Sequence, residues 1–203
     1  GIVGELHSGI WLSRQPMPRY YSNAIIFSED VEGLEPLQTL ISLNLLNGFA
    51  VKDAFAKHDL SRLNFQLLFE ATWMWRASTL PKPKKVLDDI RWTTVQDATE
   101  LEYWELAWGK QNEEAHSRTF PASLLADQDI RFIAAYREGE IIAGVIANRT
   151  DAVVGVSNLF APSLDFWSDC IAAVMDAFPG LPLVGYEHGD DLAVAKTLGF
   201  EEV

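Results

Sequence analysis

Cysteine and histidine are scarce in this sequence of 203 residues. Cys170 is the single cysteine, which excludes an internal disulfide framework and a zinc site built on several cysteines. The four histidines are widely separated and form no His-x-x-x-His pair, so we expect no metal cofactor. One thiol in a chain of this length is typical of a reducing compartment, and we predict a cytoplasmic protein.

Long apolar runs are also absent. No stretch approaches the roughly 20 apolar residues that a membrane-spanning helix needs. The first residues do not join basic side chains to an apolar segment, as a signal peptide does. We therefore expect neither a membrane partner nor export. The hydrophobic share of 48% is that of a globular chain with a core.

Basic residues are few and unevenly distributed. The net charge is −13, with six Lys/Arg against eight Asp/Glu in residues 1–80 and ten against twenty-one in the remainder. From Asp151 onward Lys196 is the only basic residue. Such a surface repels polyanions, so we expect no nucleic-acid partner. It favours a cationic substrate, although solubility alone also accounts for the charge.

A proline- and lysine-rich segment divides the chain. Residues 77–85 hold two prolines and three lysines without apolar periodicity, which is typical of a loop or an extended connector. The segment predicts a first region of residues 1–76, a linker of residues 77–86 and a second region of residues 87–203.

The second region predicts alternating strands and helices. Asp97 and Glu100 form the pattern of a helix N-cap with a capping box, and Leu101, Trp104 and Trp108 follow at helical spacing. We predict strands at 90–95, 130–137, 141–148, 152–160, 183–187 and from 200 onward, and helices at 97–110, 121–126, 164–178 and 190–197. This order implies an α/β (α+β) fold with a mixed, mostly antiparallel sheet flanked by helices.

The first region has the element order of the end of the second. We predict a strand at 24–27, a helix at 34–45, a strand at 49–53 and a helix at 54–63, beside the series that runs from 152 to 197. Leu63-Asn64-Phe65 and Leu198-Gly199-Phe200 are 135 residues apart. Because residue identity is slight, both a diverged half-repeat and a coincidence of common strand-helix-strand units remain open.

The stretch from Asp190 to Phe200, ending Ala-Lys-Thr-Leu-Gly-Phe, resembles the closing motif N-x-x-A-x-x-L-Y-x-K-x-G-F of the GNAT (N-acetyltransferase) superfamily. The resemblance covers about residues 88–203 and includes the order of elements. It implies a GNAT-like acyl-CoA acyltransferase fold, with residues 1–76 as a half unit in tandem with a nearly full unit. It also implies transfer of an acyl group from acetyl-CoA to an amine.

The resemblance also indicates where acetyl-CoA binds. In the family the central helix begins with R/Q-x-x-G-x-G/A, which holds the diphosphate through backbone N–H groups. The matching residues 162–170 have no glycine and no basic side chain, and they include Asp165 and Asp169. An ordinary capped core helix is therefore the alternative. The cofactor residues implied by position are Phe160, Ser163, Trp167, Ser168 and His188.

The catalytic residues implied by the resemblance lie near the end of the strand at 183–187. The family's proton-donating tyrosine corresponds to Ala195, which cannot transfer a proton. We therefore predict Tyr186, Glu187 and His188 as catalytic, with Tyr186 and His188 on one strand face and Glu187 on the other. The candidate acceptor loop contains Glu113, Glu114 and His116. Alternatively, the Gly-Asp-Asp that follows His188 is a simple turn and helix cap.

Three functions stay open at this point. The first is an N-acetyltransferase acting on a small cationic amine, and the second is a GNAT-shaped binding or regulatory module that does not use CoA. The third is a tandem in which basic residues of the first region help to hold the cofactor, namely Arg14, Arg19, Lys52, Lys57 and Arg62. The family sheet closes with a longer strand than residues 200–203 provide, so we expect that strand to follow Val203 or to come from another chain, as in a homodimer.

Overall fold

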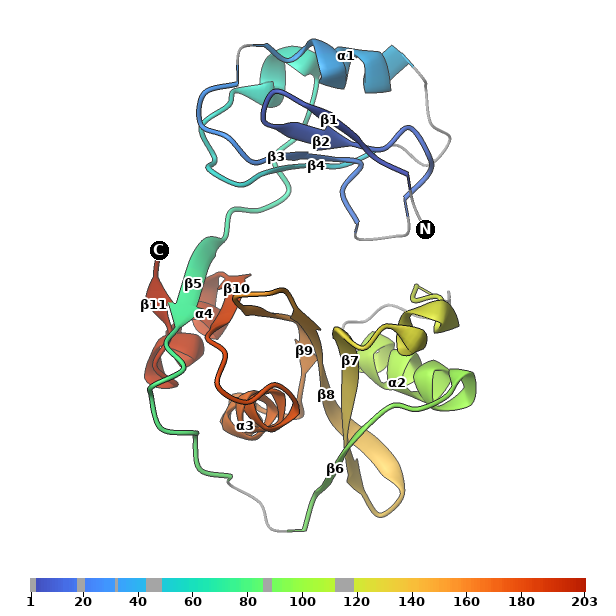
Figure 1. The fold of residues 1–203 in the computed structure, drawn as a ribbon, viewed down its shortest axis with the longest axis vertical. Helices are drawn as coiled ribbons and strands as arrows, with labels where there is room; N and C mark the ends of the chain where they lie inside the picture. Colours follow the sequence, from blue (N-terminus) through green and yellow to red (C-terminus); the bar gives the residue numbers. More distant parts are fainter. Residues whose placement is uncertain (1–2, 18–20, 32, 43–48, 86–88, 112–118) are drawn as a thin grey trace. The chain divides into compact units, whose positions relative to one another are not determined.

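The computed structural model describes residues 3–17, 21–31, 33–42, 49–85, 89–111 and 119–203. The chain divides into two compact units, Gly1–Glu70 and Ala71–Val203, and each has its own sheet (Figure 1). Among the described residues, no helix has the length and apolar character to cross a membrane.

The first unit is a four-stranded sheet with one α-helix in its described part. Strands β1 (Glu5–His7), β2 (Ile10–Leu12) and β3 (Ala24–Ile26) are antiparallel neighbours, and β4 (Val51–Asp53) is parallel to β3. The connection between β3 and β4 contains helix α1 (Glu35–Ser42). Alternate strand residues and one side of α1 form the core, which consists of Ile10, Leu12, Ala24, Ile26, Leu37 and Leu40.

The second unit is a seven-stranded sheet flanked by helices, which confirms the predicted mixed, mostly antiparallel fold. Its order is β11-β5-β10-β9-β8-β7-β6, and only the β9–β10 pair is parallel. The strands are β5 (Thr72–Arg76), β6 (Arg91–Thr94), β7 (Ile130–Arg137), β8 (Glu140–Arg149), β9 (Val154–Phe160), β10 (Leu183–Glu187) and β11 (Glu201–Glu202). The helices are α2 (Ala98–Gln111), α3 (Trp167–Ala177) and α4 (Gly189–Thr197).

Helices cover both faces of this second sheet (Figure 1). On one face α2 packs through Trp104, which is fully buried and donates its indole N–H to the Ile133 carbonyl at 2.9 Å. On the other face α3 packs through Trp167, Cys170, Ile171 and Val174 in a second core cluster. The alternation of side chains along β8 sends Val145 toward α3 and Ile146 toward α2.

The predicted start of α2 is confirmed. The Asp97 carboxylate accepts the backbone N–H groups of Thr99 and Glu100, each at 2.9 Å. The Glu100 carboxylate reaches back to the N–H of Gln96 at 2.8 Å. These bonds satisfy donors that a helix start otherwise leaves without a partner.

Strand β5 changes the predicted division of the chain. We expected the first region to end at residue 76, but β5 pairs with β10 and β11 and so belongs to the second unit. β5 lies between β10 and β11. The additional strand that we expected after Val203 or from another chain therefore comes from an earlier part of this chain. The predicted linker, residues 77–86, then connects β5 to β6 within the second unit.

Arg76 holds β5 in this position. Its side chain is buried, and it donates from Nε to the Leu198 carbonyl at 2.7 Å and from Nη2 to the Pro81 carbonyl at 2.6 Å. Leu198 ends α4, so the guanidinium also lies at the negative end of a helix dipole. Burial lowers the pKa of Arg76 from its usual range, and an arginine still remains charged at neutral pH.

The helix predicted at residues 54–63 is wrong, apart from a single turn of 3₁₀ helix, η1 (Leu60–Leu63). The Asp53 carboxylate accepts the N–H groups of Phe55, Lys57 and His58 at 2.9–3.1 Å. Ala56 adopts a φ of 52°. The side chain of Asp53 therefore organises a loop with the donors that would have begun a helix.

The strand-helix-strand part of the expected half-repeat is present in both units, whereas the helix expected at 54–63 as the counterpart of α4 is not. In each, two antiparallel strands are followed by a helix and by a strand parallel to the second of them: β2, β3, α1 and β4 in the first unit, and β8, β9, α3 and β10 in the second. The first unit begins with the β1–β2 hairpin, which we did not predict.

Candidate functional site

Strands β9 and β10 pair only where both begin. Leu183 lies opposite Val154 and Val184 opposite Gly155, and the register of these two fully described strands contains no further pairs. A Cβ on Gly185 would lie only 3.2 Å from the Val156 carbonyl oxygen. The strands therefore stay close up to Gly185 and diverge beyond it. Ligands often bind at the carboxyl ends of parallel strands, which makes this divergence the candidate site.

A bulge interrupts β9 in the diverging part. In the register with β8, Ser157 pairs with Ile146 and Phe160 with Gly144, so β9 holds one extra residue between the two pairs. Asn158, within the bulge, has a φ of 50°, a region that asparagine tolerates better than most residues. The extra residue turns Phe160 toward the α2 face of the sheet. It also places Asn158 and its successor outside the ladder.

Glu187 is the last residue of β10 and lies in the diverging part. Alternation along β10 gives it the same face as Leu183, which packs in the core beneath α3 and α4. Burial, and after it the charge of Asp191 in the first turn of α4, raises the pKa of Glu187 to about 7. A carboxyl group with this pKa can exchange protons at neutral pH, as general acid–base catalysis requires.

The other two residues predicted to be catalytic lie elsewhere. Tyr186 is on the opposite face of β10, and its ring packs edge to face against Trp73 of β5, with centroids 5.3 Å apart. Burial, followed by the charge of Glu187, raises the pKa of Tyr186. His188 is exposed and stands at the N-cap of α4. The three are neighbours in the sequence, but the sheet separates Tyr186 from Glu187.

The segment before α3 uses its own backbone donors. It contains a 3₁₀ turn, η3 (Leu164–Phe166), in which the Phe166 N–H donates to the Ser163 carbonyl at 3.1 Å. The Trp167 N–H donates to the Leu164 carbonyl. Pro162 has no N–H to offer. Ser163 is exposed beside this turn, so the predicted cofactor residue is accessible, whereas the N–H groups of Phe166 and Trp167 are engaged.

Two acidic residues lie at the start of α3. Asp165 is exposed in η3, and Asp169 is fully buried in the first turn of α3. The Ser168 hydroxyl lies 3.1 Å from the Asp165 carbonyl oxygen and 3.2 Å from the Asp169 carboxylate, so it is engaged locally. Negative charge here stabilises the helix start but competes with any bound anion.

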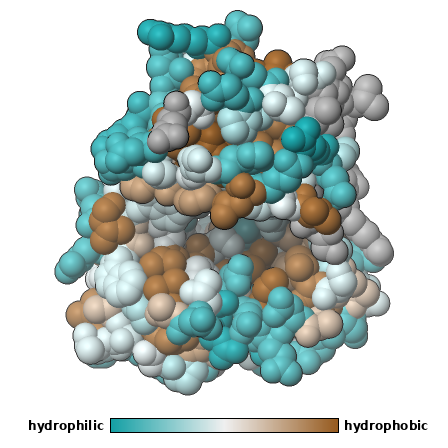
Figure 2. Space-filling model, turned by 45° about the horizontal axis from the view of Figure 1, so that its top comes forward, coloured by the Kyte–Doolittle hydropathy of each residue, from teal (hydrophilic) through white to brown (hydrophobic). Residues whose placement is uncertain are grey.

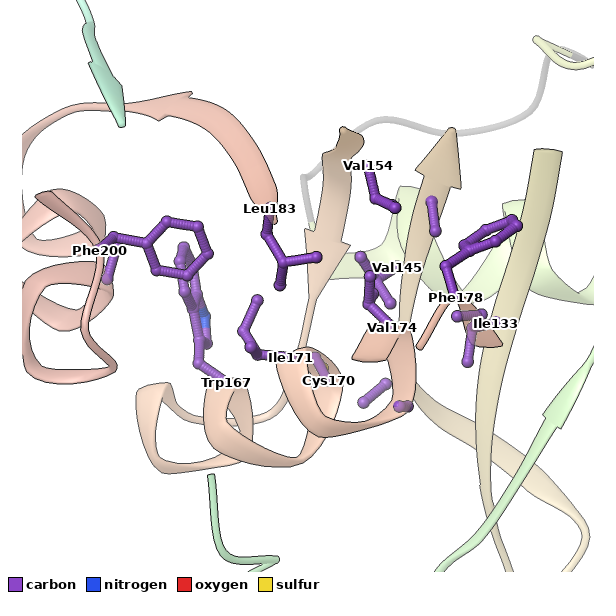
Figure 3. Close-up of a cluster of buried hydrophobic side chains, with 14 of the residues drawn as sticks. Ile133, Val145, Val154, Trp167, Cys170, Ile171, Val174, Phe178, Leu183 and Phe200 are labelled. Carbon is purple, nitrogen blue, oxygen red and sulfur yellow. The ribbon is translucent and has the colours of Figure 1, made fainter. Parts of the chain in front are cut away.

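Two further residues predicted to bind the cofactor have their side chains in the core. Phe160 packs edge to face against Trp104, with centroids 5.1 Å apart. Trp167 lies in the α3 core cluster with Leu183 and Phe200 (Figure 3). Both side chains are more than nine-tenths buried, and we assign them to packing rather than to a ligand.

Ala195 and Cys170 are both fully buried in the same cluster. Burial raises the pKa of the Cys170 thiol above its usual range, which excludes it as a nucleophile at neutral pH. The predicted acceptor loop, with Glu113, Glu114 and His116, lies outside the described residues. In the part of the chain that the structure describes, no group of three or more His, Cys, Asp or Glu side chains is placed to hold a metal.

The basic residues of the first unit are largely engaged within that unit. Three of the five considered above form ion pairs there: Arg14 with Glu5, Lys57 with Glu29 and Arg62 with Asp59. Burial lowers the pKa of Lys52 to about 8, and Arg19 lies outside the described residues. The structure thus gives no support to a cofactor held by these cations.

Comparison with known proteins identifies the fold. No family model matches the sequence, and no curated protein does. The structure is similar to a GCN5-related N-acetyltransferase from Kribbella flavida, with a TM-score of 0.67, 14% identity and coverage of 99% of this chain and 86% of that one. The chain has the GNAT fold.

Two further solved structures share this fold over nearly the whole chain. A functionally unknown conserved protein from Staphylococcus epidermidis has a TM-score of 0.63 and 15% identity, with coverage of 100% of this chain and 92% of that one. A GCN5-related N-acetyltransferase-like protein from Streptococcus suis has a TM-score of 0.56 and 13% identity, with coverage of 96% and 80%. Because the matches cover 96–100% of this chain, they extend over most of the first unit as well.

An acyl-CoA donor has a thioester arm and a nucleotide diphosphate, and the candidate site fits the first but not the second. The divergence of β9 and β10, with a bulge that takes Asn158 out of the ladder, suits the thioester arm. The start of α3 does not suit the diphosphate, because it has no glycine, engages the N–H groups of Phe166 and Trp167 in η3 and holds Asp165 and Asp169.

Sequence reasoning missed the bulge in β9 and the place of β5. Asn158 in the middle of an apolar strand is a signal for the bulge, since asparagine is enriched at positive φ. The pairing of Trp73 with Tyr186 joins residues 113 positions apart, and nothing in the local sequence indicates it.

Proposed function

We propose that the second unit transfers an acyl group from a thioester to an amine, with Glu187 as the proton acceptor. The observation that carries the proposal is a carboxyl group whose pKa is raised to about 7 at the end of β10, where β9 and β10 diverge. A base of this strength is matched to neutral pH. The fold shared with GCN5-related N-acetyltransferases supports the reaction class.

The proposed reaction needs few protein groups. The amine nitrogen attacks the acyl carbon, a C–N bond forms and the C–S bond breaks. Glu187 takes the proton that the nitrogen loses, and the leaving thiolate takes a proton from water because Ala195 has none to give. Backbone N–H groups of the bulge at Asn158 donate to the carbonyl oxygen as negative charge develops on it.

For the acceptor we propose a small molecule with two amino groups, one that attacks the acyl carbon and one that carries a positive charge. Glu187, Asp190 and Asp191 follow one another closely at the end of β10 and the start of α4. The whole chain carries a net charge of −13. A cationic amine gains from this field, and salt screens the gain. A diamine should therefore be preferred over a monoamine of equal length, and added salt should reduce that preference.

The proposal is tested by the variant Glu187→Gln, which keeps the shape of the side chain and removes the base. We expect kcat for amine acetylation to fall by about 100-fold, the usual contribution of a general base. Glu140→Gln is the matched control, since Glu140 is exposed at the start of β8. We expect it, and Tyr186→Phe on the other face, to stay within about twofold of the parent.

Two results would reject the proposal. Equal rates in Glu187→Gln and the parent would exclude Glu187 as the base. No transfer from any thioester to any amine, together with binding of an amine by calorimetry, would favour the alternative of a binding module with the GNAT fold.

A further inference from the structure

The cations around α3 gather at its carboxyl end. Lys82 and Lys85 form ion pairs with Asp176 at 2.6 and 3.9 Å, and Arg131 and Arg149 lie over the ring of Phe178, which follows the helix, at 5.7 and 5.4 Å. This placement is favourable for the helix dipole. It is the reverse of the placement that would hold an anion at the amino end of α3.

The amino end of α3 carries negative charge instead. Asp165 is exposed in η3, and Asp169 lies in the first helical turn. Lys196, the only basic residue from Asp151 onward, forms an ion pair with Glu202 of β11. A diphosphate placed at the start of α3 would meet the exposed carboxylate of Asp165 and a turn in which the N–H groups of Phe166 and Trp167 already have acceptors.

We infer that the acyl donor is recognised through its pantetheine-thioester arm, and that the nucleotide diphosphate adds no binding at α3. This inference rests on the proposed acyl transfer at Glu187 and specifies the donor for it. The arm is uncharged and enters where β9 and β10 diverge. The protein then uses a short acyl-pantetheine about as well as acetyl-CoA.

The test compares two donors that carry the same acyl group, acetyl-CoA and S-acetylpantetheine, with the full chain and one diamine acceptor. We expect their kcat/KM values to agree within about tenfold, a difference of 1.4 kcal/mol or less. A preference for acetyl-CoA of more than tenfold would overturn the inference. Transfer from neither donor would instead reject the proposed function, so the two failures are distinct.

Binding without turnover gives a second readout. Calorimetry with CoA and with pantetheine, at low and at high salt, measures whether the phosphates are held. We expect CoA to bind no more tightly than pantetheine, and its affinity to stay level or rise as salt screens the repulsion. A CoA affinity that exceeds that of pantetheine and falls with salt would show phosphates held by cations, and would contradict the inference.

A charge reversal tests the location. Asp165→Lys places a cation at the start of α3, and we expect a severalfold gain in kcat/KM for acetyl-CoA alone, with S-acetylpantetheine unchanged. Asp151→Lys is the matched control, because it makes the same charge change at an exposed position before β9. An equal gain in both variants would assign the effect to net charge and overturn the assignment to α3.

Discussion

Glu187 is half-buried and feels the charge of another acid, Asp191, and both conditions disfavour its ionised form. Its pKa is raised from an ordinary 4.5 to about 7. The folded chain therefore binds a proton between these pH values that the unfolded chain does not. The stability gained from this proton is fully present below pH 4.5 and is lost as the pH rises through about 7.

This linkage predicts a pH-dependent effect of Glu187→Gln on stability. Above pH 7 the variant avoids a buried charge, so we expect the second unit to melt about 2–4 °C higher than in the parent. Near pH 5 the parent is protonated and the two should melt together. Thermal unfolding followed at both pH values checks this, with Glu140→Gln as the control. A variant that is less stable than the parent at pH 8 would contradict the cause assigned to the raised pKa.

Asp191 is the second cause of the raised pKa of Glu187, which gives a separate prediction. Asp191→Asn removes a negative charge, so the pKa of Glu187 should fall and the pH midpoint of kcat should move below 7. Asp190→Asn is the matched control, because Asp190 neighbours Asp191 in the same helical turn and is not a cause of the shift. Equal midpoints in the two variants would exclude the assigned role of Asp191.

For single residues, the sequence could predict which face of a strand a side chain occupies, but not how deeply that side chain is buried. Alternation along residues 183–187 correctly separates Tyr186 from Glu187 onto two faces. It cannot state that Glu187 is the half-buried one, because burial depends on β5 and α4. The assignment of Trp167 to a cofactor shows the same limit, since its place beside Phe200 follows from long-range packing (Figure 3).

Among the elements, β5 depends most on a single side chain. Arg76 bonds the carbonyls of Leu198 and Pro81 from a buried position. In Arg76→Met both carbonyls lose a charged donor, and hydrogen bonds to charged groups contribute about 1.5–3 kcal/mol each. We expect the free energy of unfolding of the second unit to fall by about 3 kcal/mol in a urea titration.

A change of the exposed Lys84 to methionine serves as the control for Arg76→Met, because it removes a cation from the same unit without exposing a buried group. Surface changes of this kind usually stay within about 0.5 kcal/mol. If the two variants unfolded at the same urea concentration, the stabilising role assigned to the hydrogen bonds of Arg76 would be wrong.

Elements with strong local signals were predicted well. The start of α2 follows from Asp97 and Glu100, and the hairpin of β7 and β8 from Gly139, which has a φ of 88°. The helix expected after β4 failed, because Asp53 takes its first donors into a loop. Both outcomes concern carboxylates that accept backbone N–H groups, and only the geometry of the following residues separates a cap from a loop.

Large apolar residues lie exposed at the surface, and the face drawn in Figure 2 shows hydrophobic patches between hydrophilic ones. Three of them, Leu67, Leu68 and Phe69, are 57–82% exposed and directly precede the division between the units at Glu70. Composition indicated the linker at residues 77–86 instead. A local count of prolines and lysines cannot reveal that β5 pairs across the chain, since that pairing is long-range.

Limited proteolysis distinguishes the boundary at Glu70 from the linker predicted at residues 77–86. Exposed, irregular segments are cut first, so a protease selective for large apolar residues should cut at residues 67–69. We expect the fragment that begins near residue 70 to keep β5 and to unfold cooperatively. A first cut between residues 77 and 86, in a digest with a protease selective for lysine or of broad specificity, would place the boundary where the sequence alone indicated it.

In the proposed reaction, Glu187 accepts the proton of an attacking amine where β9 and β10 diverge. The pH dependence of kcat for acetylation of a diamine, in the parent and in Glu187→Gln, tests it most directly. We expect kcat of the parent to rise through one ionisation near pH 7, and the variant to be slow and to lack this ionisation. The same ionisation in both proteins, or a rate that does not depend on Glu187, would contradict it.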